Sequence, residues 1–186
     1  VCLALFISCQ NADNTVSLVQ SQESYSEYVD PNIGTAHSRW FFYTPAALPF
    51  GMAKLGPSTN GSLGNEQGWE ATGYDSRDNT IEGFANLHEF QIGGFLFTGM
   101  TGKLKTIPGD VENPDTGYRS RFDRNEEHAS PGYYKVKLKD YDVTAELTAT
   151  KRVGFHKYTY PASDSAYVIL DIGNELGESG DVKNAE

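Results

Sequence analysis

The strongest hydrophobic pattern lies in the last third of the chain. Apolar and polar side chains alternate from Tyr134 to Leu138, where the polar positions are lysines, and again from Val143 to Ala149. A period of two residues is typical of a strand with one face in the core and one in solvent. We therefore predict an antiparallel meander with turns at Asp140 and Gly154. Its lysine-rich outer face indicates solvent exposure and edge protection rather than a binding patch.

Three further segments are predicted to contain strands. The apolar run Tyr167–Ile172 fits a buried strand that closes the meander, and Asn79–Phe84 fits another strand. Residues 93–106 hold apolar residues among four glycines, which favours two short strands around a turn. The sequence has no pattern of an ordinary helix, internal repeat or coiled coil. We therefore predict an all-β fold, an antiparallel β-sandwich.

Two segments are harder to assign from their pattern. Prolines and glycines forbid a long helix over residues 46–55. We expect a short strand or an irregular segment there, packed by Leu48, Phe50 and Met52. The stretch after residue 106 is rich in proline, glycine and aspartate, and it is predicted to be a long loop anchored by Phe122.

Composition narrows the class of protein and of ligand. The 186 residues suffice for one domain with a hydrophobic core, and 38% hydrophobic and 22% charged residues are ordinary for a soluble domain. The net charge of −10 opposes binding to nucleic acid or to an anionic membrane surface. Aromatic residues make up 12% of the chain. Flat rings can cover the apolar face of a neutral sugar, so a carbohydrate is the favoured ligand.

The first residues have the pattern of an export signal. The apolar run VCLALFIS ends in a small residue before Cys9 and is followed by a polar stretch. It is too short to span a bilayer, and it resembles a bacterial lipobox with Cys9 as the lipidated residue. We predict a partial lipoprotein signal peptide over residues 1–9, a flexible tether over 10–27 and the β-sandwich domain over 28–186. The protein would be extracytoplasmic and membrane-tethered through lipid alone; the alternative is an N-terminal core strand.

A candidate ligand-facing surface lies between Gly64 and Gly94, where aromatic residues stand beside polar ones and glycines flank both. Trp69 follows a glycine in a polar loop, so its ring suits stacking on a sugar, with burial in the core as the alternative. His88 is interpreted equally well as a ligand contact or as a structural histidine. Glu89 is either its partner or a charge at a strand edge.

A second polar cluster is formed by His37 and Arg39, beside a tryptophan. No phosphate loop, nucleophile elbow or paired-histidine metal motif is present in the sequence. Hydrolysis of a glycosidic bond needs two carboxylates about 5–10 Å apart. The 25 acidic residues supply many pairs without singling one out. The residues alone therefore nominate no catalytic pair.

Six motifs occur in order between Tyr28 and Ile172. They are DPNIGT (30–35), LPFGM (48–52), GWEATGYD (68–75), IEGFANLH (81–88), PGYYKV (131–136) and AELTATKRVGFHKYTYP (145–161). This set resembles the N-terminal region of family-92 glycoside hydrolases, which are bacterial exo-acting α-mannosidases. The resemblance implies a β-sandwich followed by a helical (α/α)₆ barrel, with the active site in the groove between them.

The resemblance also implies a division of chemistry between the two domains. Members of the family depend on Ca²⁺ and invert the anomeric configuration with a glutamate acid and an aspartate base. These residues and most of the calcium environment belong to the barrel, so no catalytic or metal-binding residue is expected in this chain. Trp69 takes the position of a tryptophan that lines the subsite for the leaving-group sugar. His88 takes that of the second histidine in a His-x-His pattern.

Two departures from the family pattern bear on the substrate. Asn86 replaces the first histidine of that pattern, and AHSRWFFYTPAA (36–47) replaces a run rich in glycine and histidine. These changes suggest a differently shaped groove, in which His37, Arg39 and Glu89 take polar contacts. The expected function is one wall of the substrate groove of an α-mannosidase acting on mannose-containing glycans, inert without the barrel. The alternatives are a stand-alone carbohydrate-binding module and a structural lid on the barrel.

Overall fold

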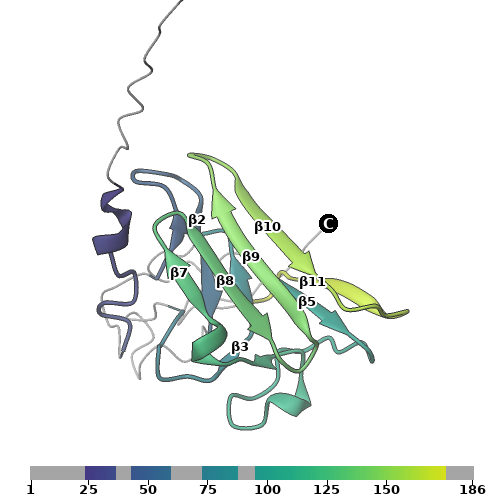
Figure 1. The fold of residues 1–186 in the computed structure, drawn as a ribbon. Coiled ribbons are helices and arrows are strands. Elements are labelled where there is room, and N and C mark those ends of the chain that lie inside the picture. The colour runs from purple at the N-terminus through teal and green to yellow at the C-terminus, as the bar shows by residue number, and fades with distance from the viewer. Residues whose placement is uncertain (1–23, 37–42, 60–72, 88–94, 175–186) are drawn as a thin grey trace, which may run out of the picture.

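The computed structural model describes residues 24–36, 43–59, 73–87 and 95–174. Within these residues the strands form two sheets that face each other and a small two-stranded ribbon (Figure 1). The strands pair in antiparallel fashion throughout both sheets and the ribbon. The predicted all-β antiparallel sandwich is confirmed.

The first sheet has five strands in the spatial order β1-β2-β4-β5-β11. They are β1 (Ala46–Ala47), β2 (Lys54–Ser58), β4 (Gly83–Ala85), β5 (Leu96–Thr101) and β11 (Ala166–Asp171). The second sheet has four strands in the order β10-β9-β8-β7. They are β7 (His128–Ser130), β8 (Tyr133–Leu138), β9 (Val143–Ala149) and β10 (Gly154–Thr159). The ribbon pairs β3 (Thr80–Ile81) with β6 (Ser120–Arg121).

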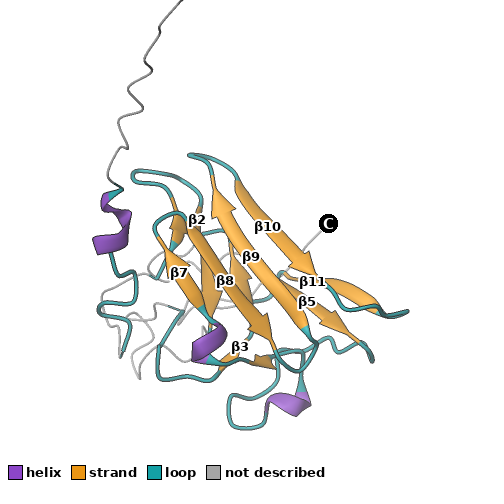
Figure 2. Cartoon of the chain, in the orientation of Figure 1, coloured by secondary structure: helices purple, strands orange, loops and turns teal. Residues whose placement is uncertain are grey.

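Helical structure among the described residues is limited to short 3₁₀ turns, purple in Figure 2. They are η1 (Tyr25–Tyr28), η3 (Pro114–Thr116) and η4 (Arg124–Glu126). In the part of the chain that the structure describes, no helix has the length and apolar character needed to cross a membrane.

The hydrophobic core lies between the two sheets. Alternate residues of β8 and β9 are fully buried, including Tyr134, Val136 and Leu147, and they belong to one cluster with Leu55 and Phe84 of the first sheet. Burying a large apolar side chain stabilises the fold by about 1.5–3 kcal/mol. The period of two residues in the sequence therefore predicted the buried face of these strands correctly.

One of the two turns predicted in the meander is confirmed. Asp140 lies in the turn between β8 and β9. Gly154 is instead the first residue of β10, and the turn precedes it, closed by a 2.9 Å hydrogen bond from the Thr150 N–H to the Val153 carbonyl. A Cβ at Gly154 would lie 2.6 Å from Leu55 Cδ1. The glycine therefore serves close packing between the sheets rather than a turn.

The last strand, β11, departs from the prediction. It does not close the meander but pairs with β5 and forms an edge of the first sheet. It is also not buried, since Val168 and Leu170 remain 58% and 49% exposed. An apolar run predicts a strand, but it does not reveal which sheet the strand joins or how many of its faces are covered.

Two predictions for the first half of the chain are also corrected. Leu48, Phe50 and Met52 do not pack the segment after β1 but are exposed. The chain turns away from the sheet there, with Phe50 at a φ of 59°. Residues 79–84 do not form one strand but enter both β3 and β4, which are separated by Glu82.

The segment from residue 95 to 132 contains more regular secondary structure than its composition predicted. Its first part holds one strand, β5, rather than two strands around a turn. The predicted long loop contains β6, β7 and the turns η3 and η4. Phe122 is 7% exposed and belongs to the core cluster, so its predicted role as an anchor is confirmed.

Candidate functional site

The residues predicted to contact a glycan, and the predicted lipidation site, lie outside the described residues. They are His37, Arg39, Trp69, His88, Glu89 and Cys9. The structure does describe the residues that flank these segments. On either side of residues 60–72, the Thr59 N–H donates a 2.8 Å hydrogen bond to the Gly73 carbonyl. The two residues that flank the segment containing Trp69 are therefore adjacent.

The flanks of residues 37–42 lie near the same point. Tyr43 stacks on Tyr74, with ring centroids 4.1 Å apart and planes inclined by 22°. The Ser76 N–H donates to the Thr35 carbonyl at 3.0 Å. The structure thus brings together the flanks of the segments that contain His37 and Trp69.

The flank before residues 88–94 lies elsewhere. Asn86 accepts a 3.0 Å hydrogen bond from the Lys54 N–H, at the end of β2 opposite to Thr59. The Asn86 side chain contacts His156 of β10, with 2.8 Å between Asn86 Oδ1 and His156 Nε2. The residue that replaces the first histidine of the family pattern is therefore bound to the sandwich itself.

A carboxylate cluster centred on Glu127 lies next to the paired flanks. Glu127 Oε1 accepts hydrogen bonds from the hydroxyls of Tyr74 (2.9 Å) and Tyr134 (2.7 Å), and Oε2 accepts from Arg124 Nη1 at 2.6 Å. Arg124 also donates to the Tyr74 hydroxyl and, at 2.6 Å, to the Asp78 carbonyl. The Glu127 side chain is 7% exposed, so its charge is neutralised inside the protein by an ion pair.

The tyrosines of this cluster are held in their neutral form. Burial, followed by the Glu127 charge, raises the pKa of Tyr134 and of Tyr74 above their ordinary values. Burial and the neighbouring Tyr74 likewise raise the pKa of Tyr43, whose hydroxyl donates to Asn32 Oδ1 at 2.9 Å. The phenols therefore stay protonated at neutral pH, and those of Tyr74 and Tyr134 both donate to Glu127 Oε1.

A cleft of about 240 Å³ opens on this cluster. Its lining residues, Asn32, Thr35, Ser76, Arg124, Glu127 and Ala129, come from segments far apart in the sequence. Ligand pockets typically measure about 300–1,000 Å³, so the described part of this cleft is too small for an oligosaccharide. It can present hydrogen-bonding groups to one small polar group of a ligand.

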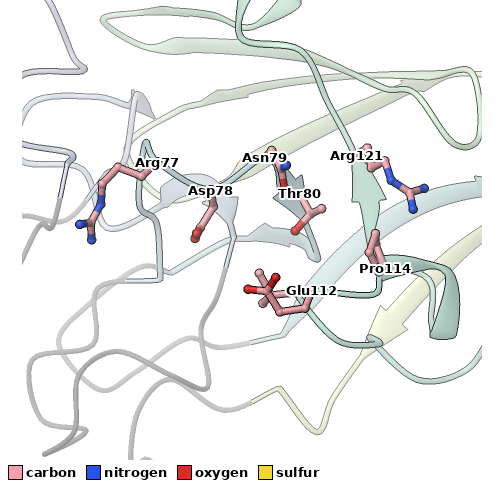
Figure 3. Close-up of a pocket in the computed structure, with 8 residues that line it drawn as sticks. Arg77, Asp78, Asn79, Thr80, Glu112, Pro114 and Arg121 are labelled. Carbon is pink, nitrogen blue, oxygen red and sulfur yellow. The ribbon is translucent and has the colours of Figure 1, made fainter.

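A second cleft, of about 340 Å³, lies between β3, β6 and the loop before η3 (Figure 3). It is lined by Arg77, Asp78, Asn79, Thr80, Val111, Glu112, Pro114 and Arg121. Arg121 binds Asp115 through two 3.0 Å contacts and Asp140 through a third of 3.0 Å, and these bonds raise its pKa. The described lining of neither cleft includes an aromatic ring for stacking on a sugar.

A buried ion pair supports the point where the Trp69 segment is attached. Arg119 Nη2 and Glu82 Oε2 are 2.9 Å apart, and both side chains are 3% exposed. Arg119 Nη1 donates to the Thr59 carbonyl, and Glu82 Oε1 accepts from the Ser58 hydroxyl at 2.6 Å. The sequence carried one signal of this pair, a glutamate inside the otherwise apolar strand pattern TIEGF (80–84).

The sequence did not single out the residues of the Glu127 cluster, for a physical reason. Arg124 and Glu127 stand in a polar stretch that predicts a solvated loop, and their tyrosine partners are up to 53 positions away. No group of three or more His, Cys, Asp or Glu side chains among the described residues is arranged to bind a metal ion.

Comparison with known proteins places this fold in a family. The glycosyl hydrolase family 92 N-terminal domain matches residues 28–186. No curated protein sequence matches the chain. Because the matched region covers most of the chain, the chain belongs to glycosyl hydrolase family 92, as its N-terminal domain.

Solved structures of family members are similar to this one. The α-mannosidase BT3965 from Bacteroides thetaiotaomicron, in complex with mannoimidazole, is 37% identical with a TM-score of 0.75, over 83% of this chain and 20% of that one. The glycosyl hydrolase ccman5 is 25% identical with a TM-score of 0.62, over 82% and 21%. The inverting mannosidase BT2199 from B. thetaiotaomicron shares the fold at 24% identity and a TM-score of 0.61, over 81% and 20%. This chain spans about a fifth of their length.

Proposed function

We propose that the chain forms one wall of the glycan-binding groove of a secreted α-mannosidase that acts on mannose-containing glycans. The observation that carries the proposal is the 37% identity to an α-mannosidase whose structure holds mannoimidazole. The net charge of −10 and the aromatic content of 12% fit a neutral sugar better than a nucleic acid.

In this proposal the ring of Trp69 is a platform for a sugar, and His37, Arg39, His88 and Glu89 supply polar contacts. Two observations support a shared surface for the segment that contains His37 and the segment that contains Trp69. Their flanks are joined by one backbone hydrogen bond, from Ser76 to Thr35, and by the stack of Tyr43 on Tyr74. The buried ion pair next to these flanks gives that surface a rigid base.

The reacting groups are proposed to come from the rest of the protein. The chain spans about a fifth of the related enzymes, and inverting glycosidases need an acid and a base about 6.5–9.5 Å apart. We propose that the (α/α)₆ barrel supplies both carboxylates and the ligands of a calcium ion. The chain alone is then inert, and the barrel is its main partner.

The location of the protein is a separate proposal. We propose that Cys9 is lipidated after cleavage of residues 1–8, which tethers an extracytoplasmic protein to a membrane without spanning it. Mass spectrometry of the mature protein tests this. A diacylated cysteine at the new N-terminus is expected, and a mature protein that retains residues 1–8 would contradict it.

Substitution of Trp69 in the full-length enzyme tests the groove wall. Trp69→Ala is expected to lower kcat/KM for a mannose disaccharide about tenfold, because a stacked ring contributes about 0.5–1.5 kcal/mol beyond its buried area. Tyr25→Ala is the control, since Tyr25 is an aromatic residue that is 70% exposed in η1. Unchanged kinetics of a folded Trp69→Ala enzyme would contradict the proposed sugar-stacking role and favour the alternative, a structural lid on the barrel.

The carbohydrate-binding alternative is tested on two proteins. The full-length protein is expected to release mannose in a calcium-dependent manner, and residues 10–186 alone are expected to release none. Binding of mannosides by the full-length protein without any hydrolysis would favour the stand-alone binding module. Release of mannose by residues 10–186 would contradict the assignment of the carboxylates to the barrel.

A further inference from the structure

The two sheets of the sandwich are unequal, with five strands facing four. β10, the edge of the smaller sheet, lies over the middle of the larger one. Its His156 ring is 5.2 Å from the Phe97 ring of β5, and Gly154 approaches Leu55 of β2. β11 extends the larger sheet beyond β5, on the side where the smaller sheet has β10 as its edge strand (Figure 1). Among the described residues, no strand of the second sheet lies opposite β11.

The pairing of β11 with β5 identifies which of its faces is inward. Val168 is paired with Gly99 and Leu170 with Phe97, and cross-strand partners share a face. A Cβ on Gly99 would lie 3.0 Å from Val143 Cγ1 and 3.1 Å from Tyr158 Cδ1. Val168 and Leu170 therefore point toward the layer of the second sheet.

These inward-facing side chains are nevertheless exposed. Val168 and Leu170 are 58% and 49% exposed, and Ile172 and Phe95 beyond the strand ends are 38% and 57% exposed. The strand sequence AYVILD contains no proline or lysine, which usually protect a free edge. A continuous apolar stripe on the core side of an unguarded edge strand indicates a covered interface.

We propose that a further β-strand, from the part of the same polypeptide outside residues 1–186, pairs with the free edge of β10 and covers Val168 and Leu170. The matched part of this chain covers only about a fifth of each related enzyme, and the remaining length of such an enzyme can supply this strand. A fifth strand in the second sheet matches the five strands of the first. Its inward residues are apolar at every second position. This inference concerns completion of the sandwich and does not depend on the glycan role.

The test uses the full-length protein and two valines of similar exposure. Val168→Asp is expected to lower the thermal midpoint by about 5 °C or more, because it places a charge in a covered interface. Val153→Asp is the matched control, since Val153 is 51% exposed in the turn before β10. A shift of less than about 2 °C is expected there. Equal small shifts for both variants would overturn the proposal.

Thiol labelling gives a second measurement if Val168→Asp does not fold. Val168→Cys and Val153→Cys are made in a full-length background in which Cys2 and Cys9 are serine. The Val168→Cys thiol is expected to react with a maleimide at least about tenfold more slowly than the Val153→Cys thiol. Equal rates would overturn the proposal. Protection that disappears on dilution together with a dimer in light scattering would also overturn it, because a second copy would then cover the face.

Discussion

Two arginine–glutamate pairs sit at different depths in this domain. Arg119 and Glu82 are both 3% exposed, whereas the Arg124 side chain of the second pair is 36% exposed and Glu127 is 7% exposed. The first pair binds backbone and hydroxyl groups of the surrounding strands. The second faces a cleft and binds tyrosine hydroxyls.

The difference in depth gives the two pairs different physical roles. A fully buried pair contributes little net stability when intact, but it fixes which groups meet because losing one partner leaves an unpaired charge. A half-open pair keeps a guanidinium edge accessible to solvent or ligand. The buried pair thus serves as a scaffold beneath the flanks of the Trp69 segment, and the open pair can contribute to a surface.

The largest effect is expected from breaking the buried pair. Arg119→Met should lower the free energy of unfolding by about 3–5 kcal/mol, because Glu82 stays buried without a counter-charge. Urea unfolding measures this. Arg121→Met is the matched control at an arginine that is 43% exposed and should have a far smaller effect. Equal losses for the two variants would contradict the contrast between buried and open pairs.

A smaller effect is expected at the open pair. Glu127→Gln should lower the free energy of unfolding by about 1–3 kcal/mol. The amide NH₂ of glutamine must face a group that itself donates a hydrogen bond, and the ion pair with Arg124 is lost. Glu126→Gln, at the neighbouring exposed position, controls for the loss of one negative charge. Urea unfolding with near-ultraviolet circular dichroism reports both stability and tyrosine packing. A Glu127→Gln protein as stable as Glu126→Gln would show that the cluster does not hold the fold.

His156 of β10 is a partly buried titratable group outside both ion pairs. Burial lowers the pKa of His156 from 6.5 to about 4. The unfolded chain then binds the proton more readily, so stability is complete above pH 6.5 and falls as the pH drops toward 4. The loss should reach about 1–2 kcal/mol, allowing for partial exposure.

Unfolding of His156→Gln at pH 7 and pH 4.5 measures this contribution. The variant should lose less stability between the two values than the unsubstituted protein does. His128→Gln is the control, because His128 is exposed on β7. An unchanged pH dependence in His156→Gln would show that the imidazole is not the group responsible.

The smallest effect is expected at the surface. Asp115 is exposed, and its bonds to Arg121 lower its pKa. Asp115→Asn should leave the urea midpoint at neutral pH unchanged within error, since Arg121 keeps its contact with Asp140 and water screens the pair. A clear loss of stability would mean that the second cleft depends on this pair.

The sequence predicted best where a single periodic pattern decides the structure. Alternation from Val143 to Ala149 indicated both the strand and its buried face, because one face of an antiparallel strand meets the core. The run at Tyr167–Ile172 indicated a strand but not its partner. Sheet assignment depends on contacts with β5, which is far away in the sequence.

The candidate site was less accessible to sequence reasoning. Glu82 and Arg119 are 37 positions apart, and Tyr74 and Glu127 are 53 apart. No local pattern links such residues, because the sandwich alone brings them together. Trp69 and the other predicted glycan contacts came from composition and family resemblance, and their roles stay predictions.

The 2.8 Å hydrogen bond from the Thr59 N–H to the Gly73 carbonyl joins two residues that are 14 positions apart in the sequence. The loop-closure entropy of a surface segment rises slowly with its length, by about 0.6 kcal/mol per doubling. A change of length between Thr59 and Gly73 is therefore expected to cost little loop-closure entropy as long as this hydrogen bond forms.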